Sequence, residues 1–416
     1  MEYGLIGAKL GHSYSKDIHN QIGNYKYELK EIAAEDIDSF MKAHDFKGIN
    51  VTIPYKQTVI PYLDEIDDAA KEIGAVNTIV NKGGKLFGYN TDFIGLKRLI
   101  LSQNIELADK TVLILGTGGT SKTARAVAKS LKAKEILIVS RKSGEGVITY
   151  EEAASKYKNA QIIINTTPCG MFPKINDFPI DVTAFPKLEG LIDVIYNPLR
   201  TQLVLRAQEL GIKASGGMYM LVQQAIAAAE YFFDRQLEPS KADEIFNSLL
   251  ADKQNIILVG MPGCGKSTVG KKLAKLLGKD FFDTDELIQQ QENMHPSQII
   301  TQRGEEAFRN IESKICEEMA VKTNAVISTG GGAILRKENV IHLKNNGIIF
   351  FIDRKLENIC PTGDRPLSNS REKLQAVYDK RYPIYCACCD YKIESDENMN
   401  HTIDKIIKLF GGKNEN

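Results

Sequence analysis

The chain has 416 residues, which is too long for one ordinary domain and predicts roughly two or three. With 43% hydrophobic residues, 25% charged residues and a net charge of zero, it has a globular composition and no charge excess favouring nucleic acid or membranes. The segment Met1-Glu2-Tyr3-Gly4 is unlike the start of a signal peptide, and the apolar runs are too short to span a bilayer. Seven scattered cysteines fit a reducing compartment, so we expect a cytoplasmic protein.

Apolar strand-like runs alternate with helical patterns along the chain, which predicts α/β layers with parallel sheets. Three blocks are expected, at residues 1–101, 102–215 and 255–416. Helices are predicted over Gly217–Tyr231 and Lys241–Leu250, ahead of the last block. Because only Ala251–Gln254 then remain, we expect a short linker at 251–254 rather than a long tether.

Polar motifs beside glycine or proline occupy expected loops of the first block. They are Gly11-His12-Ser13-Tyr14-Ser15, Asn50-Val51-Thr52-Ile53-Pro54-Tyr55-Lys56, Gly74-Ala75-Val76-Asn77-Thr78 and Asn90-Thr91-Asp92. Each motif alone is equally typical of a turn with solvated charges. Together, the hydroxyls, amides, lysine and acid favour a site for a small, polyhydroxylated and anionic substrate.

The second block opens with a nucleotide-binding pattern. A predicted strand, Thr111–Leu115, is followed by Gly116-Thr117-Gly118-Gly119-Thr120-Ser121 and by a helix through Leu131. In such a loop Gly116 serves the tight turn, Gly118 lets the backbone approach a pyrophosphate, and Ser121 is small enough for helix–strand packing. An ordinary turn between a strand and a helix is the alternative. We favour dinucleotide binding by Gly116, Gly118, Gly119, Thr120 and Ser121.

The end of the next predicted strand indicates which dinucleotide binds. Glu135–Val139 leads into Ser140-Arg141-Lys142, where a site that prefers NAD would place an acid for the ribose hydroxyls. Cations at this position suit a 2′-phosphate instead. The sequence therefore favours NADP over NAD.

With these motifs in order, the chain resembles shikimate dehydrogenase over roughly residues 1–250. Further matching segments are Asn165-Thr166-Thr167-Pro168-x-Gly170-Met171, Asp193-x-x-Tyr196 and Met220-Leu221-Val222-x-Gln224. The resemblance implies an α/β substrate-binding domain (1–101, completed by helices in 216–250) and a Rossmann domain (102–215) that binds NADP(H). It also implies a catalytic pair, Lys56 and Asp92, with substrate contacts from Ser13, Ser15, Thr52, Asn77, Tyr196 and Gln224.

Two features depart from the family pattern. Lys16 stands where a proline commonly follows the serine pair. The stretch after Lys142 is short, because only Ser143–Tyr150 lies where the family usually has a helix with another arginine. The second departure leaves the strength of NADP selectivity open.

The last block opens with a complete phosphate-binding loop. An apolar run, Ile256–Val259, leads into Gly260-x-x-x-x-Gly265-Lys266-Ser267, and a helical pattern over Val269–Leu277 follows. Backbone N–H groups of such a loop surround an anionic phosphate at the N-terminus of the helix. We expect Gly260, Gly263, Gly265 and Thr268 to contribute to ATP binding, Lys266 to reach the β- and γ-phosphates, and Ser267 to ligate Mg²⁺.

From Asn255 to about Phe410 the chain resembles shikimate kinase, with a parallel P-loop α/β fold like that of nucleoside monophosphate kinases. The matching segments are Phe282-Asp283-Thr284-Asp285, Gly304-Glu305-Glu306-x-Phe308-Arg309, Ser328-Thr329-Gly330-Gly331-Gly332, Gly363-Asp364-Arg365-Pro366-Leu367 and Arg381-Tyr382-Pro383-Ile384-Tyr385. The resemblance implies that Asp285, Arg309, Gly331, Gly332 and Arg381 hold the substrate, with Asp285 also placed to accept the proton of the attacking hydroxyl. It further implies that Arg365 covers the phosphates and that Asp283 joins Ser267 at Mg²⁺. Asn358 departs from the pattern, because an arginine that stacks on adenine is expected there.

We therefore expect a bifunctional enzyme of aromatic amino acid biosynthesis. One half would reduce 3-dehydroshikimate with NADPH, and the other would phosphorylate the resulting shikimate with ATP to shikimate 3-phosphate. Two alternatives stay open: a first half that acts mainly on quinate, and a regulatory sensor that kept both folds without catalysis. The sensor would be expected to lack Lys56, Asp92, Lys266 or Asp285, and all four are present. Oligomeric state and any role of Cys386 and Cys389 stay open.

Overall fold

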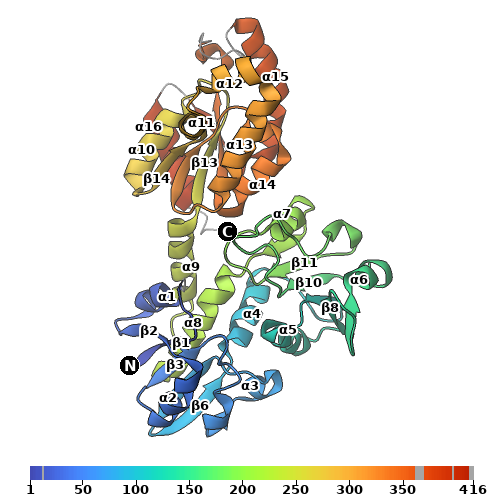
Figure 1. The fold of residues 1–416 in the computed structure, drawn as a ribbon, viewed down its shortest axis with the longest axis vertical. Coiled ribbons are helices and arrows are strands. Elements are labelled where there is room, and N and C mark those ends of the chain that lie inside the picture. The colour runs from blue at the N-terminus through green and yellow to red at the C-terminus, as the bar shows by residue number, and fades with distance from the viewer. Residues whose placement is uncertain (12–13, 361–369, 396–397, 412–416) are drawn as a thin grey trace. The chain divides into compact units, whose positions relative to one another are not determined.

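The computed structural model describes residues 1–11, 14–360, 370–395 and 398–411 (Figure 1). The chain divides into two compact units, Met1–Phe246 and Asn247–Asn416. Within the described ranges, no helix is long and apolar enough to cross a membrane. Short 3-10 helices punctuate the loops: η1 (Ala34–Asp36), η2 (Ile60–Tyr62), η3 (Val182–Ala184), η4 (Ala333–Leu335) and η5 (Leu356–Asn358).

The first unit begins with a mixed sheet in the order β2-β1-β3-β5-β6-β4. Its strands are β1 (Tyr3–Gly7), β2 (Tyr27–Glu31), β3 (Gly48–Val51), β4 (Glu65–Ile66), β5 (Thr78–Lys82) and β6 (Lys85–Tyr89), and the helices near them are α1 (Ser15–Ile22), α2 (Ile37–Ala43) and α3 (Asp68–Ile73). The β3–β5 and β5–β6 pairs are antiparallel, so the expectation of parallel sheets throughout was wrong here. The cause is local. Gly83 and Gly84 adopt φ of +63° and +88°, which allows a two-residue turn between adjacent strands.

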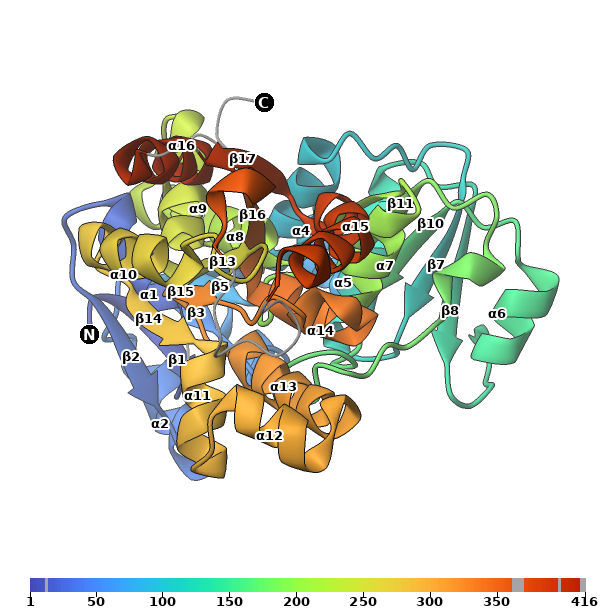
Figure 2. The ribbon, with the colours of Figure 1, turned by 90° about the horizontal axis from the view of Figure 1, so that it is seen from above.

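The second sheet is wholly parallel, in the order β12-β11-β10-β7-β8-β9, of which Figure 2 labels β11, β10, β7 and β8. Its elements are β7 (Thr111–Leu115), α5 (Gly119–Ser130), β8 (Glu135–Ser140), β9 (Val147–Thr149), α6 (Tyr150–Lys156), β10 (Ile162–Asn165), β11 (Gly190–Asp193), α7 (Gln202–Glu209) and β12 (Lys213–Ser215). This is the doubly wound order of dinucleotide-binding domains, in which the strand order reverses between the first and fourth strands. The expected Rossmann fold is confirmed, with the glycine loop after β7 at that reversal.

Two long helices connect the sheets of the first unit, namely α4 (Thr91–Ser102) and α8 (Met218–Phe233). Leu96 and Leu99 of α4 pack in one core cluster with strand residues of the second sheet. Phe232 of α8 packs with Leu5 and other residues of the first sheet. A Cβ at Gly95 would lie 2.6 Å from the Met220 carbonyl oxygen, so a glycine is required where the two helices meet. The helix predicted over Gly217–Tyr231 is thus confirmed as α8, and it carries Gln224.

The second unit contains a parallel sheet in the order β14-β15-β13-β16-β17. Its elements are β13 (Asn255–Val259), α10 (Lys266–Leu277), β14 (Asp280–Asp283), α11 (Thr284–Glu292), α12 (Pro296–Arg303), α13 (Glu305–Ala320), β15 (Ala325–Ser328), α14 (Lys337–Asn346), β16 (Gly347–Arg354), α15 (Arg371–Cys388), β17 (Tyr391–Ser395) and α16 (Met399–Gly411). The central strands β13 and β16 carry continuous apolar runs because helices cover both faces of the sheet. The predicted strand Ile256–Val259 and the helix after the phosphate-binding loop are confirmed as β13 and α10.

The joint between the units lies in α9 (Ser240–Lys253). The division falls between Phe246 and Asn247, earlier than the expected linker at 251–254, and residues 251–253 belong to the helix. The Lys279 ammonium donates to the carbonyl oxygens of Ala251 and Gln254, at 2.6 and 3.2 Å. The end of α9 is therefore capped by a lysine of the second unit instead of forming a loose linker.

Candidate active sites

The loop after β13 has the backbone that phosphate binding requires. Gly260, Gly263 and Gly265 have φ of +151°, +84° and +96°, backbone conformations that residues other than glycine rarely adopt. Lys266 is nearly buried, and its Nζ donates to the carbonyl oxygens of Gly260 and Met261 at 3.0 and 3.1 Å. These neutral acceptors hold the ammonium beside the loop without neutralising it.

Asp283, the last residue of β14, and Ser267, at the start of α10, lie within hydrogen-bond distance of each other. The Ser267 hydroxyl donates to Asp283 Oδ2 at 2.6 Å and lies 3.4 Å from the Ser328 hydroxyl. Asp283 Oδ1 also accepts from the backbone N–H of Asp285, at 3.0 Å, which fixes the carboxylate at the N-terminus of α11. A carboxylate and hydroxyl oxygens are the donor set that Mg²⁺ prefers. The residues present therefore fit the expected ion.

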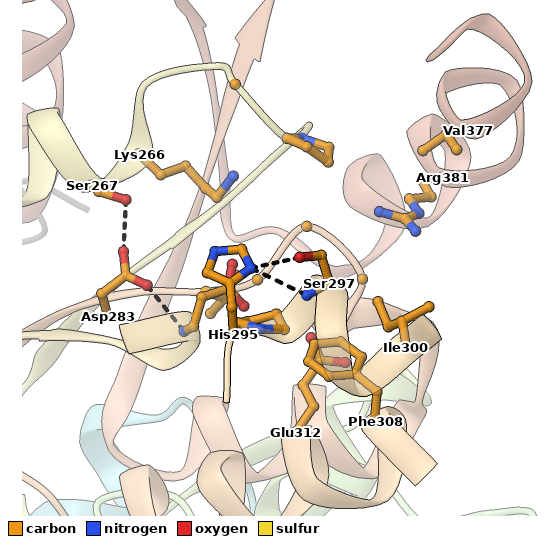
Figure 3. Close-up of a pocket in the computed structure, with 18 of the residues that line it drawn as sticks. Lys266, Ser267, Asp283, His295, Ser297, Ile300, Phe308, Glu312, Val377 and Arg381 are labelled. Atoms are coloured by element: carbon orange, nitrogen blue, oxygen red, sulfur yellow. Dashed lines mark hydrogen bonds between the residues drawn. The ribbon is translucent and has the colours of Figure 1, made fainter. Parts of the chain in front are cut away.

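A cavity of about 440 Å³ lies beside this loop in the second unit (Figure 3). It brings together nearly all the kinase residues expected from sequence: Gly263, Gly265, Lys266, Ser267, Thr268, Asp283, Asp285, Arg309, Gly331, Gly332 and Arg381. Ser267 and Asp283 lie on one side of the view and Arg381 on the other, with His295 between them. Gly260 lies in the loop but does not line the cavity, and Arg365 lies outside the described residues.

A buried ion pair forms one wall of the cavity. Arg309 Nη1 lies 2.6 Å from Glu312 Oε2, and their side chains are 8% and 0% exposed. The second oxygen of Glu312 has no hydrogen-bond partner among the described residues. Burial raises the pKa of Glu312, and the Arg309 guanidinium opposes that rise. Sequence reasoning missed Glu312, although its position three residues after Arg309 on α13 placed both on one helix face.

Asp285 has the electrostatics of a proton acceptor. Burial and the neighbouring Asp283 carboxylate raise the pKa of Asp285, whereas Lys266 and Arg309 lower it. A carboxyl whose pKa lies above its ordinary value is a stronger base once ionised, and it can take a proton from a hydroxyl bound against it. Its position among both cations keeps the ionised form accessible.

Each glycine of the Gly330-Gly331-Gly332 loop lies close to a different neighbour. A Cβ at Gly330 would lie 2.7 Å from Asp285 Oδ1, and one at Gly331 would lie 2.9 Å from the Pro262 ring. A Cβ at Gly332 would lie 2.3 Å from Arg309 Nη1. The three glycines therefore let this loop approach the acid, the phosphate-binding loop and the guanidinium at once.

Arg381 reaches the cavity from α15 and is 5% exposed. One turn later, the Tyr385 hydroxyl lies 2.9 Å from the Gly260 carbonyl oxygen and is also hydrogen-bonded to the Gly331 carbonyl. Tyr385 thus connects the phosphate-binding loop, the glycine loop and the helix that carries Arg381.

A second cavity, of about 370 Å³, lies in the first unit. It is lined by seven of the predicted substrate and catalytic residues: Ser15, Thr52, Lys56, Asn77, Asp92, Tyr196 and Gln224. Ser13 lies outside the described residues. Lys56 Nζ lies 2.6 Å from Asp92 Oδ2, and their side chains are 30% and 21% exposed. Loops far apart in sequence thus converge on one ammonium–carboxylate pair, as expected.

Amides hold the surrounding loops in place. Asn77 Oδ1 accepts from the Thr91 backbone N–H at 2.7 Å, which fixes the start of the helix that carries Asp92. Asn50 Nδ2 donates to the Thr78 hydroxyl at 3.0 Å, and Asn50 Oδ1 accepts from Tyr27 at 2.7 Å. Sequence reasoning assigned no role to Lys9, Tyr14 or Asn50, all of which line the cavity. Asn50 and Tyr14 gave a signal, because each lies within a motif singled out from the sequence, whereas Lys9 gave none.

The dinucleotide loop lies next to this cavity, and Thr120 lines it. Gly116 has φ of +106°, and a Cβ there would lie 3.0 Å from the Thr166 hydroxyl. A Cβ at Gly118 or Gly119 would meet nothing within 4 Å, so the loop is open at these two residues. Ser121 is buried, at 4% exposed. Ser140, Arg141 and Lys142 follow at the end of β8, with both cations exposed. This open glycine turn with exposed cations beyond it fits a phosphorylated dinucleotide.

The loop that carries Tyr196 is fixed by a fully buried carboxyl group, Asp193. Asp193 accepts from Asn165 Nδ2 at 3.0 Å, from the Ile195 backbone N–H at 3.1 Å and from the Thr201 hydroxyl at 2.7 Å. Burial raises the pKa of Asp193 to about 7, and these three donors oppose the rise. In this motif Asp193 therefore holds the loop in place, and Tyr196 lines the cavity.

Known families match both units. A family model for the shikimate dehydrogenase substrate binding domain matches residues 5–79, and one for shikimate kinase matches residues 262–410. Shikimate dehydrogenase (NADP(+)) of Clostridium perfringens is 35% identical over 271 residues, which cover 59% of this chain and 97% of that protein. The same enzyme of Clostridium beijerinckii is 42% identical over 255 residues, covering 57% and 93%.

A solved structure agrees with these matches. The chorismate mutase/shikimate 5-dehydrogenase fusion protein of Clostridium acetobutylicum is 38% identical, with a TM-score of 0.57, covering 59% of this chain and 96% of that one. The likeness therefore spans nearly the whole of each relative. The chain belongs to the shikimate dehydrogenase family through its first unit and carries a shikimate kinase domain in its second.

Proposed function

We propose that the chain is a bifunctional enzyme of the shikimate pathway. Its first unit reduces 3-dehydroshikimate to shikimate with NADPH, and its second phosphorylates shikimate to shikimate 3-phosphate with ATP. The observation that carries this proposal is the presence of two separate cavities in one chain, each with its own catalytic set. The hydroxyl formed at C3 by the first reaction is the phosphoryl acceptor of the second.

In the reductase reaction the cofactor supplies a hydride to C3. Lys56 donates a hydrogen bond to the ketone oxygen and delivers the proton that the alkoxide requires. The Asp92 carboxylate, 2.6 Å from Lys56 Nζ, holds the ammonium in position and directs it at the oxygen. Hydroxyl and amide groups of Ser15, Thr52, Asn77, Tyr196 and Gln224 orient the ring. Ser13 belongs to the same proposed set.

Cofactor choice is assigned to the turn after β8. The loop from Gly116 to Ser121 holds the pyrophosphate with backbone N–H groups at the start of α5. Arg141 and Lys142, with Ser140, bind the 2′-phosphate that distinguishes NADPH from NADH. The names of the Clostridium relatives specify NADP(+), which supports this assignment.

In the kinase reaction ATP supplies the phosphoryl group. Arg309 and Arg381 bind the substrate carboxylate, the backbone of Gly331 and Gly332 positions the ring, and Asp285 accepts the proton of the 3-hydroxyl. Lys266 and Arg365 neutralise charge on the transferred group, within the loop formed by Gly260, Gly263, Gly265 and Thr268. Ser267 and Asp283 hold Mg²⁺, which supplies further charge neutralisation there.

A coupled assay tests the proposal. The purified chain is given 3-dehydroshikimate and NADPH with or without ATP and Mg²⁺, and both NADPH loss and shikimate 3-phosphate are followed. NADPH should be consumed in either case, while shikimate 3-phosphate should form only with ATP. Quinate with NAD⁺ serves as the comparison substrate for the alternative dehydrogenase. Failure to consume NADPH, or faster oxidation of quinate than of shikimate, would refute the assignment of the first unit.

The two units are further proposed to be independent catalytic domains in a cytoplasmic protein. The division between the units lies within α9, so a cut at that point would break the helix. Two overlapping fragments, residues 1–254 and 240–416, each contain the whole of α9. Each fragment should fold and catalyse its own reaction at a rate near that of the intact chain. Loss of one activity on separation would show that the units depend on each other. Cell fractionation tests the location.

A further inference from the structure

The loop after β1 brings a lysine to the dehydrogenase cavity. Lys9 lines the cavity beside Gly11, Tyr14 and Ser15. The backbone around it is fixed, because the Leu10 N–H donates to Glu31 Oε1 at 2.8 Å and the Ala8 N–H to the Ile53 carbonyl at 3.4 Å. Leu10 is 8% exposed, whereas Lys9 is exposed. The loop is thus held by its neighbours while the lysine side chain stays available.

The charged residues around this cavity differ in whether they form an ion pair. Among its described lining residues, the ionisable cations and anions are Lys9, Lys56 and Asp92. Lys56 and Asp92 neutralise each other at 2.6 Å. Lys9 has no ion pair with any residue in the described part of the chain. Burial raises the pKa of both Tyr14 and Tyr196, so these phenols stay neutral and add no competing negative charge.

The proposed substrate has two polar ends. 3-Dehydroshikimate carries its carboxylate at C1 and its ketone at C3 of a rigid six-membered ring. With the ketone oxygen at Lys56, the carboxylate points away from that ammonium, and Lys9 is the remaining cation among the described residues that line the cavity. We propose that Lys9 is a specificity residue that pairs with the C1 carboxylate and selects carboxylated rings over uncharged ones. This inference rests on the proposed reductase function.

A matched set of variants tests Lys9. Lys9→Gln removes the charge, Lys9→Arg keeps it, and Lys16→Gln removes an exposed charge that does not line the cavity. KM and kcat are measured for 3-dehydroshikimate and for its methyl ester, which has the ring and ketone without the negative charge. Lys9→Gln should raise the KM for the acid about three- to tenfold, as for a partly exposed ion pair, with little change in kcat. The KM for the ester should be unchanged, which also reports that the variant is folded.

Salt gives a second readout. The difference in KM between wild type and Lys9→Gln should shrink as ionic strength rises, because an exposed pair is screened. Lys9→Arg should restore the wild-type KM, and Lys16→Gln should leave all values unchanged. Equal effects of Lys9→Gln on acid and ester, or no effect on either, would overturn the inference and leave Lys9 a solvated surface residue. Absence of wild-type turnover would instead refute the reductase proposal itself.

Discussion

The two cavities, proposed to bind nearly the same ring, hold their charges differently. In the kinase cavity the Arg309–Glu312 pair is 8% and 0% exposed, and Asp285 interacts with Lys266 and Arg309. In the dehydrogenase cavity the Lys56–Asp92 pair is 30% and 21% exposed. Buried charges must be partnered before any substrate arrives, because an uncompensated charge in the interior is costly. The same charges near solvent are screened, so substitution there should impair the reaction more than the fold.

The largest effects should come from the two lysines, and they should be separable. Lys56→Ala removes the proton donor and should lower kcat of the reductase by ~10²–10⁴-fold while leaving phosphorylation of added shikimate unchanged. Lys266→Ala should abolish kinase turnover, because it removes the ammonium that neutralises charge on the phosphates. The reductase should be spared, because Lys266 does not line its cavity. Both activities are measured on each variant. A parallel fall in both would indicate misfolding or one shared site.

Stability should distinguish the buried pair from the exposed one. Glu312→Gln removes the buried counter-charge of Arg309 and leaves only the exposed Glu305 carboxylate, at 3.1 Å, so it should destabilise the second unit by about 3 kcal/mol. Asp92→Asn should cost less than about 1 kcal/mol in the first unit, although reduction should fall strongly. Hydrogen exchange of the core strands in each unit provides the measurement. Similar losses in both variants would contradict the contrast between the cavities.

Arg141→Ala should affect cofactor choice more than reaction rate. Loss of a charge-assisted hydrogen bond to the 2′-phosphate is worth ~1.5–3 kcal/mol, so the KM for NADPH should rise roughly tenfold to a hundredfold and that for NADH little. Lys158→Ala, an exposed cation elsewhere in the same sheet domain, serves as the control. Equal changes for both cofactors would show that Arg141 does not bind the phosphate, and Lys142 would then be tested.

Asp193 is a buried carboxyl group that, unlike Glu312, has only neutral partners. Its pKa is raised to about 7, so the folded state binds its proton more tightly than the unfolded state does. The free energy of unfolding of the first unit should therefore fall as pH rises from about 4 to 7, by up to about 1.4 kcal/mol per pH unit. Asp193→Asn can keep the bonds from Asn165 and Ile195 at its oxygen, with its amide nitrogen donating to the Thr201 hydroxyl, and should remove this fall. An unchanged pH slope in hydrogen exchange would show that Asp193 titrates normally.

The smallest predicted effect concerns the glycine loop of the kinase cavity. In Gly332→Ala the new Cβ would overlap the Arg309 guanidinium, at 2.3 Å from Nη1, and should displace it. We expect the KM for shikimate to rise about tenfold with the KM for ATP unchanged. Gly411→Ala, where a Cβ meets nothing within 4 Å, is the control. A wild-type KM would show that Arg309 can move aside without cost.

Many residues of both sites can be predicted from the sequence, because they belong to motifs of residues that are close together in the chain. Gly260, Gly265 and Lys266 specify a phosphate loop through backbone conformation and spacing; both glycines have positive φ, and Gly265 and Lys266 line the cavity. Glu312 and Lys9 were missed for a shared reason: each is one charged residue among many on a helix or loop. The importance of each residue depends on the groups that face it in the folded protein, and the spacing of residues along the chain does not reveal those groups.

The sequence by itself determined the motifs, their order and the alternation of strands and helices, since these depend on residues near one another in the chain. The tertiary structure decided the rest. It paired β3 with β5 in the antiparallel direction, placed the division between the units within α9, and brought α4 and α8 together at Gly95. It also buried Glu312 and Asp193, which shifts their pKa values. Burial and opposite charge are properties of the packed chain, so they exist only once distant segments meet.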